Sequence, residues 1–350
     1  MALDLLDRPA MAVATHTLPA PYLLFLGDTI EPGFAKTAFG LRDWAPERCL
    51  GEWSLPSATV STGLPRLSPA QAAAQGARAL VIGVANPGGI IPASWMPELL
   101  AAIEAGLDIV AGMHVRLASL APLAEAAARH GRALIDLRTP PADLAVATGL
   151  KRTGRRLLTV GTDCALGKKY TALAIARGLA ARGLDATFRA SGQTGIMIAG
   201  QGIAIDAVIA DFAAGAAELL SPAAAPDHLD VIEGQGSLFH PAYAAVSLAL
   251  LHGSQPDGFI VCHQPGRAAV LGSPAFRVPP IAAVIAQTVM LGRLTNPAIR
   301  CVGISLNTAG MTAEDADRVI AETGAEHGLP AADPIRGGAA FDALLDACQA

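Results

Sequence analysis

A loop of small residues that ends in Gly-Lys follows an apolar run in the stretch VGTDCALGKKYTAL, residues 160–173. Such a loop between a strand and a helix can point backbone N–H groups at an anion, and the helix adds the positive end of its dipole. Against the phosphate-loop pattern G-x-x-x-x-G-K-[ST], Gly167 and Lys168 fit, but Lys169 replaces the hydroxyl residue and Thr162 the first glycine. We therefore predict a cofactor-binding site formed by Gly161, Thr162, Cys164, Ala165, Gly167, Lys168, Lys169 and Tyr170.

Lys169 bears on which anion suits this loop. In nucleotide hydrolases the Ser or Thr at its position ligates the Mg²⁺ that bridges the phosphates, and an ammonium group there would repel that metal. Lys168 and Lys169 together suit a metal-free polyphosphate, such as the pyrophosphate or 3′-phosphate of coenzyme A. No metal is expected, and the five scattered cysteines show no CxxC spacing, which argues against a zinc site and a disulfide framework.

The composition indicates an α/β protein. Of the 350 residues, 52% are hydrophobic and 4% aromatic, which suits two domains of Ala-rich helices packed on parallel strands. The net charge of −5 and the absence of a Lys/Arg run argue against nucleic acid as a partner. The N-terminus lacks the features of a signal peptide, and no apolar stretch is long enough for a membrane span. We therefore expect a cytoplasmic protein.

Residues 1–148 are predicted to form a Rossmann-like domain, because short apolar runs alternate with Ala-rich helical stretches. Strands are expected in PYLLFLGD, ARALVIGV, LDIVAGM and RALIDLR, with helices in PELLAAIEAG and LAEAAARHG. The turn Asn86-Pro87-Gly88-Gly89 does not match GxGxxG, so we interpret it as a tight turn and expect no nicotinamide cofactor.

Residues 149–350 are predicted to form a P-loop-like domain with a doubly wound parallel sheet. The boundary is placed near residue 150, in the proline-containing and charged stretch RTPPADLAVATGLKRTGRR. Strands are expected in RLLTVG, DATFRA, LDVIEG, GFIVCH and RCVGISLN, and helices at 167–182, 206–220, 241–252, 280–293 and 312–327.

Long and unusual strings in both domains resemble one bacterial family. They are KTAFGLRDWAPERCLGE (36–52), GTDCALGKKYTAL (161–173), RASGQTGIMIAGQGIAIDAVIADF (189–212), EGQGSLFHPAYAAVSLALLHGSQPD (233–257) and ISLNTAG (304–310). The family was long labelled as of unknown function, and its better-understood members are D-glutamate N-acetyltransferases of the DgcN type. The resemblance implies transfer of an acetyl group from acetyl-CoA, as cosubstrate, to the amino group of D-glutamate.

Other functions fit parts of the sequence. The loop and the stretch DVIEGQGS are similar to GTDTxxGKT and VEGxGG of dethiobiotin synthetase, so an ATP-dependent P-loop ligase or kinase is the main alternative. Lys169, which replaces the Mg²⁺-binding hydroxyl, argues against this alternative and favours the acetyltransferase. A regulator that binds a nucleotide or CoA without catalysis is a third possibility, and an NAD-linked epimerase is a fourth, disfavoured by the missing GxGxxG.

Acetyl transfer to an amine needs a base that removes a proton from the substrate ammonium group. Glu233, His240 and His263 all follow predicted strand ends, where α/β sheets place ligands, and Glu233 is the first candidate. The alternatives are that Glu233 is a partner of Lys168 and that His240 holds its own turn. Each alternative fits the sequence about as well as the catalytic role.

Two residues inside the phosphate loop have further interpretations. The Asp163 carboxylate would oppose an anion unless it points away, toward the acyl group or the amine, so Asp163 is a fourth catalytic candidate. Cys164 lies near a helix N-terminus, which would favour a thiolate able to accept an acetyl group. A small buried filler is the favoured interpretation of Cys164, because direct transfer needs no thiol.

Recognition of the amino-acid substrate needs groups that pair with two carboxylates. Arg189 and Arg267 follow predicted strand ends and carry the planar guanidinium that suits this task; the alternative for one of them is a surface ion pair. A flexible glycine loop, SGQTG, is expected to supply a hydrogen-bonding wall of Ser191, Gln193 and Thr194. Polar residues of the first domain either reach the cleft or pack between domains: Lys36, Thr37, Arg42 and Asp43. A homo-oligomer is expected.

Overall fold

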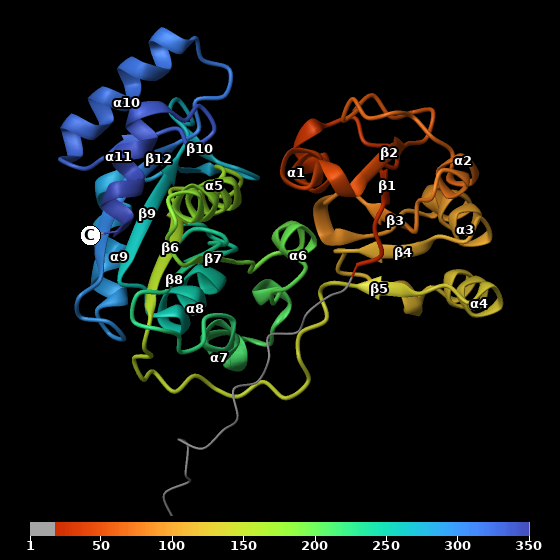
Figure 1. The fold of residues 1–350 in the computed structure, drawn as a ribbon, viewed down its shortest axis with the longest axis horizontal. Helices are drawn as coiled ribbons and strands as arrows, with labels where there is room; N and C mark the ends of the chain where they lie inside the picture. The colour runs from red at the N-terminus through yellow and green to blue at the C-terminus, as the bar shows by residue number, and fades with distance from the viewer. Residues whose placement is uncertain (1–17, 350) are drawn as a thin grey trace, which may run out of the picture. The chain divides into compact units, whose positions relative to one another are not determined.

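The computed structural model describes residues 18–349, which form two compact units (Figure 1). The N-terminal unit contains residues 18–140 together with Gln193–Ala207, and the C-terminal unit contains residues 141–192 and 208–349. Residues 1–17, on which part of the signal-peptide prediction rests, lie outside the described residues. No helix within 18–349 combines the length and the apolarity that a membrane crossing requires.

A five-stranded parallel sheet forms the centre of the N-terminal unit, in the order β2-β1-β3-β4-β5. The strands β1 and β3 are buried along their whole length, as expected for a parallel sheet covered on both faces. The bounds are β1 (Tyr22–Phe25), β2 (Cys49–Trp53), β3 (Ala79–Ile82), β4 (Asp108–Ala111) and β5 (Leu134–Asp136).

Helices α2, α3 and α4 lie on the same side of this sheet (Figure 1), and their apolar faces share one core with alternate residues of the strands. Phe25 and Ile82 of the sheet meet Leu99, Ile103 and Leu123 of the helices in this core. Helix α1 instead contacts α6, a helix that the chain supplies from beyond residue 190. The helices are α1 (Lys36–Trp44), α2 (Pro69–Ala74), α3 (Met96–Glu104), α4 (Ala121–His130) and α6 (Gln193–Ala199).

Short 3-10 helices connect several of these elements: η1 (Pro32–Ala35), η2 (Pro46–Arg48), η3 (Pro87–Gly89), η4 (Ala93–Trp95), η5 (Leu117–Ser119) and η6 (Ile205–Ala207). The turn at residues 86–89 is thus a tight one, as predicted.

The prediction of a flexible glycine loop after Arg189 was wrong for residues 193–199, which form α6. The reason is burial, because Ile196, Met197 and Ile198 bury their side chains although only seven residues are helical. Tertiary contact with α1 therefore overrides the local glycine signal.

A six-stranded parallel sheet forms the centre of the C-terminal unit, in the order β13-β12-β9-β6-β8-β7. The register sets Gly161, the last residue of β6, beside Cys262 of β9, so that the two strands end together. The bounds are β6 (Arg155–Gly161), β7 (Ala186–Arg189), β8 (Leu229–Ile232), β9 (Gly258–His263), β12 (Arg300–Leu306) and β13 (Ala331–Ala332). An antiparallel hairpin of β10 (Ala269–Val270) and β11 (Ser273–Arg277) follows β9.

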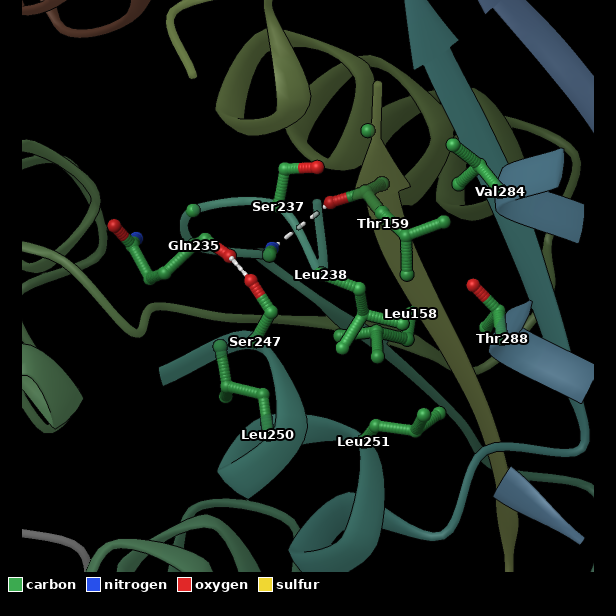
Figure 2. A pocket seen from close by; sticks show the side chains of 14 residues that line it. Leu158, Thr159, Gln235, Ser237, Leu238, Ser247, Leu250, Leu251, Val284 and Thr288 are labelled. Atoms are coloured by element: carbon green, nitrogen blue, oxygen red, sulfur yellow. Dashed lines mark hydrogen bonds between the residues drawn. The ribbon is translucent and has the colours of Figure 1, made fainter. Parts of the chain in front are cut away.

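Helices cover both faces of this sheet. Helices α5 and α11 share a core with Leu157 of β6, whereas its neighbour Leu158 faces Leu251 of α8 and Val284 of α9 (Figure 2). Successive strand residues point to opposite faces, so α5 with α11 and α8 with α9 lie on different sides. The helices are α5 (Lys168–Ala181), α7 (Ala210–Leu220), α8 (Ala244–Ser254), α9 (Ile281–Gly292), α10 (Ala313–His327) and α11 (Gly338–Gln349).

The α/β class with two parallel sheets is confirmed, and each strand expected from the sequence is present. The helix expected at 206–220 begins only at Ala210, after η6. Elements that the sequence analysis did not predict are α1, β2, α2, the β10–β11 hairpin, α11 and β13.

Candidate phosphate site and its surroundings

The predicted phosphate loop connects the end of β6 to the start of α5, at the carboxyl edge of the C-terminal sheet. Ala165 and Gly167 have left-handed backbones, with φ of 52° and 104°. Glycine adopts the second of these at no steric cost, which explains Gly167 directly before the helix. Alternation of left- and right-handed backbones is how anion-binding loops turn their N–H groups inward.

Lys168 is the first residue of α5 and is 6% exposed. Its Nζ donates a hydrogen bond to the backbone oxygen of Asp163, 2.8 Å away within the loop. Burial lowers the pKa of the Lys168 ammonium group, and the Cys164 and Cys262 thiols and the Asp163 carboxylate partly oppose this shift. A buried cation beside backbone amides is suited to an anionic ligand.

Gly234 is the second residue after β8, directly after Glu233. Its lack of a side chain lets the Lys168 side chain lie close to the backbone there. A Cβ at position 234 would lie 1.6 Å from the Thr159 oxygen and 3.3 Å from Cδ of Lys168. The stretch DVIEGQGS therefore requires glycine at this position, because the backbone of β6 and the Lys168 side chain lie so close to it.

Lys169 is half-buried, and its Nζ lies 4.8 Å from the centre of the Tyr170 ring. A cation over an aromatic face is stabilised by the ring quadrupole. The position that carries the Mg²⁺-binding hydroxyl in nucleotide hydrolases thus holds a positive charge next to the loop.

The Asp163 carboxylate is fully buried and points to protein groups on two sides. Its Oδ1 accepts a hydrogen bond from the Cys164 amide at 2.6 Å, and its Oδ2 accepts from Nη1 of Arg267 at 3.0 Å and the Leu271 amide at 2.8 Å. Arg267 also donates to the Cys164 oxygen at 2.8 Å and to Oε1 of Gln264 at 2.5 Å. The Asp163–Arg267 pair therefore links the phosphate loop to the segment after β9.

Arg189 also has a protein carboxylate as its partner. Its Nε lies 2.6 Å from Oδ1 of Asp230, which is 1% exposed and also contacts Nε2 of His228 at 3.0 Å. Both arginines predicted to bind substrate carboxylates thus already form ion pairs within the C-terminal unit. Substrate binding by either residue stays a prediction.

Glu233 lies buried at the end of β8. Its Oε2 accepts hydrogen bonds from the Ser191 and Gly192 amides, both at 3.1 Å. Its backbone oxygen accepts another from Oγ of Ser191 at 2.5 Å. These bonds hold the carboxylate at Oε2, which gives Glu233 an anchoring role, and its role as the base stays a prediction.

Two substitutions distinguish the anchor from the base. We expect Glu233→Gln to retain turnover within about threefold, because its amide oxygen can still accept from both amides, at a loss of about 1 kcal/mol of stability. Glu233→Ala leaves two buried donors unpaired and is expected to lose about 1–3 kcal/mol in urea unfolding. If Glu233 were the base, turnover of Glu233→Gln would fall by about 10² to 10⁴ while its stability changed little.

The chain between β8 and α8 carries His240 and is fixed at several points. The Gly234 amide donates to Oγ1 of Thr159 at 2.9 Å, and Oγ of Ser247 donates to the Gln235 oxygen at 2.7 Å (Figure 2). Nε2 of Gln235 also donates to Oγ of Ser191 at 3.0 Å. The cavity behind this turn measures only about 10 Å³ and is lined mostly by apolar groups, which leaves no room for a substrate.

His263 ends β9 and contacts the phosphate loop. Its Nδ1 lies 3.0 Å from Oγ1 of Thr162. Burial lowers the pKa of His263, and the nearby Arg267 and His327 lower it further. The lowered pKa favours the neutral form of the imidazole, which can accept a proton.

The predicted hydrogen-bonding wall is divided between the two units. Ser191 belongs to the C-terminal unit with Glu233, whereas Gln193 and Thr194 open α6 of the N-terminal unit. There Oγ1 of Thr194 lies 2.9 Å from Oγ1 of Thr37 of α1. The Gln193 side chain lies so close to the backbone of Gly112 that no space is left for a Cβ on Gly112.

The remaining polar candidates of the N-terminal unit have local partners. Arg42 pairs with its neighbour Asp43 at 2.6 Å and donates to the Thr62 oxygen at 3.0 Å. Lys36 is the first residue of α1 and also has an interaction partner.

A cavity of about 390 Å³ adjoins the phosphate loop within the C-terminal unit. Gly167, Tyr170 and Thr171 of the loop and α5 form one wall of this cavity. The other wall follows β12 and β13 and carries Asn307, Asp333 and Arg336. Asp333 accepts from Oγ1 of Thr308 at 2.6 Å and is 6% exposed.

Asn307, Asp333 and Arg336 were not among the predicted site residues. Asn307 lies within ISLNTAG, a string already noted, and follows directly after a strand, which is a signal that points to a site. Asp333 and Arg336 follow a strand of two residues, too short to predict.

Two family models match the chain: a P-loop domain of unknown function, DUF1611, over residues 145–345, and its Rossmann-like partner DUF1611_N over residues 48–140. A D-glutamate N-acetyltransferase of Pseudoalteromonas is 46% identical over 91% of this chain and 96% of its own length. One of Tritonibacter scottomollicae is 46% identical over 95% of this chain and 99% of its own. A crystal structure of a DUF1611 protein from Anabaena variabilis covers 94% of this chain and 99% of that one, at 34% identity and a TM-score of 0.84.

Proposed function

We propose that this chain, which belongs to the DUF1611 family, transfers an acetyl group to the amino group of D-glutamate. The observation that carries the proposal is its 46% identity, over nearly the whole length, to two D-glutamate N-acetyltransferases. The family resemblance predicted from the sequence is confirmed by the same comparisons, as is a Rossmann-like domain followed by a P-loop domain.

We further propose acetyl-CoA as the donor of the acetyl group. The buried Lys168 and the loop amides suit its phosphates, and the charge of Lys169 suits a polyphosphate that carries no Mg²⁺. The adjoining cavity of about 390 Å³ offers a place for the nucleoside part, with Asn307 and Asp333 as hydrogen-bonding groups.

In the proposed reaction the neutral amine attacks the thioester carbonyl, the C–N bond forms, and the C–S bond breaks to release CoA. The substrate ammonium group must first lose a proton. His263 is our candidate for this step, because it ends β9 beside the phosphate loop, with Nδ1 3.0 Å from Oγ1 of Thr162, and its lowered pKa favours the neutral imidazole. The released thiolate of CoA takes up a proton to become the free thiol.

The test is to mix the purified protein with acetyl-CoA and D-glutamate, without metal, and to follow thiol release and the mass of the product. We expect one thiol for each N-acetyl-D-glutamate formed. L-glutamate and D-norvaline serve as matched controls for configuration and for the side-chain carboxylate. Absence of the product, or nucleotide turnover with Mg-ATP in its place, would contradict the proposal.

A cytoplasmic homo-oligomer, with a small-molecule substrate and without nucleic-acid or membrane partners, remains part of our prediction. Light scattering of the native protein measures the oligomeric state directly.

A further inference from the structure

His240 brings an unsatisfied polar atom to the phosphate loop. One of its ring nitrogens, Sγ of Cys164 and a carboxylate oxygen of Asp163 all lie within 4.8 Å of one another. His240 is only 3% exposed, and its Nε2 has no hydrogen-bond partner among residues 18–349. A buried polar atom without a partner is unfavourable unless a ligand supplies the missing hydrogen bond.

The protonation state of the ring follows from its other nitrogen. Nδ1 of His240 accepts a hydrogen bond from the Ala242 amide at 3.1 Å, so Nδ1 carries no proton. A neutral imidazole then has its proton on Nε2, which is a donor and not an acceptor. The Tyr243 ring, at 4.5 Å between centroids, packs against the imidazole and holds its orientation.

A metal ion fits this cluster poorly for two reasons. The Asp163 oxygens already accept from Arg267, Leu271 and Cys164, and the Arg267 guanidinium would repel a divalent cation. Ligation by Nε2 would also require His240 to move its proton to Nδ1, against the Ala242 amide. A donor N–H next to Asp163 and Cys164 of the phosphate loop instead matches an anion bound by that loop.

We propose that His240 binds the donor's phosphate through Nε2–H, as a neutral hydrogen-bond donor that completes the anion site of the phosphate loop. This role rests on the proposed function, because it takes the anion to be a polyphosphate of acetyl-CoA. It also removes His240 from the candidate bases, since a nitrogen that already carries a proton cannot accept the proton of the amine. The bond that the Gly234 amide donates to Thr159 and the bond that the Gln235 oxygen accepts from Ser247 fix the turn that presents the ring.

Three substitutions of His240 separate the roles, with inorganic pyrophosphate and CoA as probes in calorimetric titrations without metal. His240→Gln places an amide N–H close to the position of Nε2, whereas His240→Asn places it close to that of Nδ1, and His240→Ala offers none. We expect His240→Gln to bind both probes within about threefold of the wild type. His240→Asn and His240→Ala are expected to bind about tenfold or more weakly, since a donor to a charged group is lost.

The tautomer is measured independently, from the nitrogen shifts of ¹⁵N-histidine in the free protein at neutral pH. We expect the Nε2–H form for His240, and an Nδ1–H form would overturn the inference even if the enzyme were fully active. Unchanged pyrophosphate binding by folded His240→Ala, with collapsed turnover, would make His240 a catalytic group and also overturn it. So would tight binding of Zn²⁺ that depends on His240.

These outcomes are distinct from failure of the proposed function. A wild-type protein that binds pyrophosphate through His240 but forms no N-acetyl-D-glutamate contradicts the proposed function alone. A wild-type protein that acetylates D-glutamate but binds neither pyrophosphate nor CoA through His240 contradicts this inference alone. Thermal melting of each variant confirms that it is folded before binding is compared.

Discussion

Replacement of Lys168 by methionine is expected to weaken acetyl-CoA binding by about ten- to a hundredfold while making the free protein more stable. The loss of affinity follows from the loss of one charge-assisted contact, which is worth about 1.5–3 kcal/mol. The gain in stability follows from burial, because the free protein holds this ammonium group at 6% exposure with the neutral backbone oxygen of Asp163 as its hydrogen-bond partner. Methionine keeps the length and the apolar stem of the side chain. Replacing a buried charge by an apolar group commonly stabilises a protein, here by on the order of 1 kcal/mol.

The stability difference should depend on pH in a defined direction. The folded-state pKa of Lys168 is lowered, so the unfolded chain binds more protons between that pKa and the ordinary value for lysine. The stability contributed by this group therefore rises with pH across that window. We expect the stability of Lys168→Met to exceed that of the wild type most at neutral pH. This difference in stability should disappear as the pH approaches the ordinary pKa of lysine. Urea unfolding at several pH values measures the difference.

Lys169→Met is the matched control for this prediction. Lys169 is half-buried and lies over the Tyr170 ring, so its removal is expected to change stability by less than about 1 kcal/mol. Equal binding of acetyl-CoA by Lys168→Met and the wild type would show that the loop does not hold the donor. A fall in stability of Lys168→Met at neutral pH would show that the Asp163 contact outweighs the burial of the charge.

The strands and the phosphate loop were predictable because their signals are local. Runs made mostly of apolar residues, such as YLLF and RLLTVG, are long enough to indicate buried strands, and the Gly-Lys pair opens a helix. Residues 193–199 were not predictable in this way, since their helix depends on contact with α1, which lies more than a hundred residues earlier in the chain. Local pattern says little about such a contact.

The partners of the charged site residues were also beyond the sequence. Arg267 pairs with Asp163, 104 residues away, and Arg189 pairs with Asp230, 41 residues away. A guanidinium after a strand end looks the same in the sequence whether its carboxylate comes from a substrate or from the protein. The tautomer of His240 likewise depends on one backbone amide, and only the folded turn shows which nitrogen that amide meets.

Removal of Arg267 is expected to destabilise the C-terminal unit by about 3–5 kcal/mol, because it leaves the fully buried Asp163 carboxylate without its cation. The same change removes a donor to the Cys164 oxygen and so affects the loop itself. Asp163→Asn in the Arg267→Ala background removes the buried charge at nearly constant volume. We therefore expect the double variant to recover part of the stability lost in Arg267→Ala, a non-additivity that urea unfolding of the full cycle measures.

Arg182→Ala is the matched control for this cycle, since Arg182 pairs with the exposed Asp342 and Asp346 on the surface of the same unit. Its loss is expected to change stability far less than the loss of Arg267, because solvent screens an exposed ion pair. The competing role of Arg267, as the partner of a D-glutamate carboxylate, has a different signature. In that case Arg267→Ala would remain as stable as the Arg182 control, its KM for D-glutamate would rise by about ten- to a hundredfold, and Asp163→Asn would restore nothing. A stable Arg267→Ala variant with this kinetic defect would return Arg267 to the substrate site, whereas an unstable one rescued by Asp163→Asn assigns it to support of the phosphate loop.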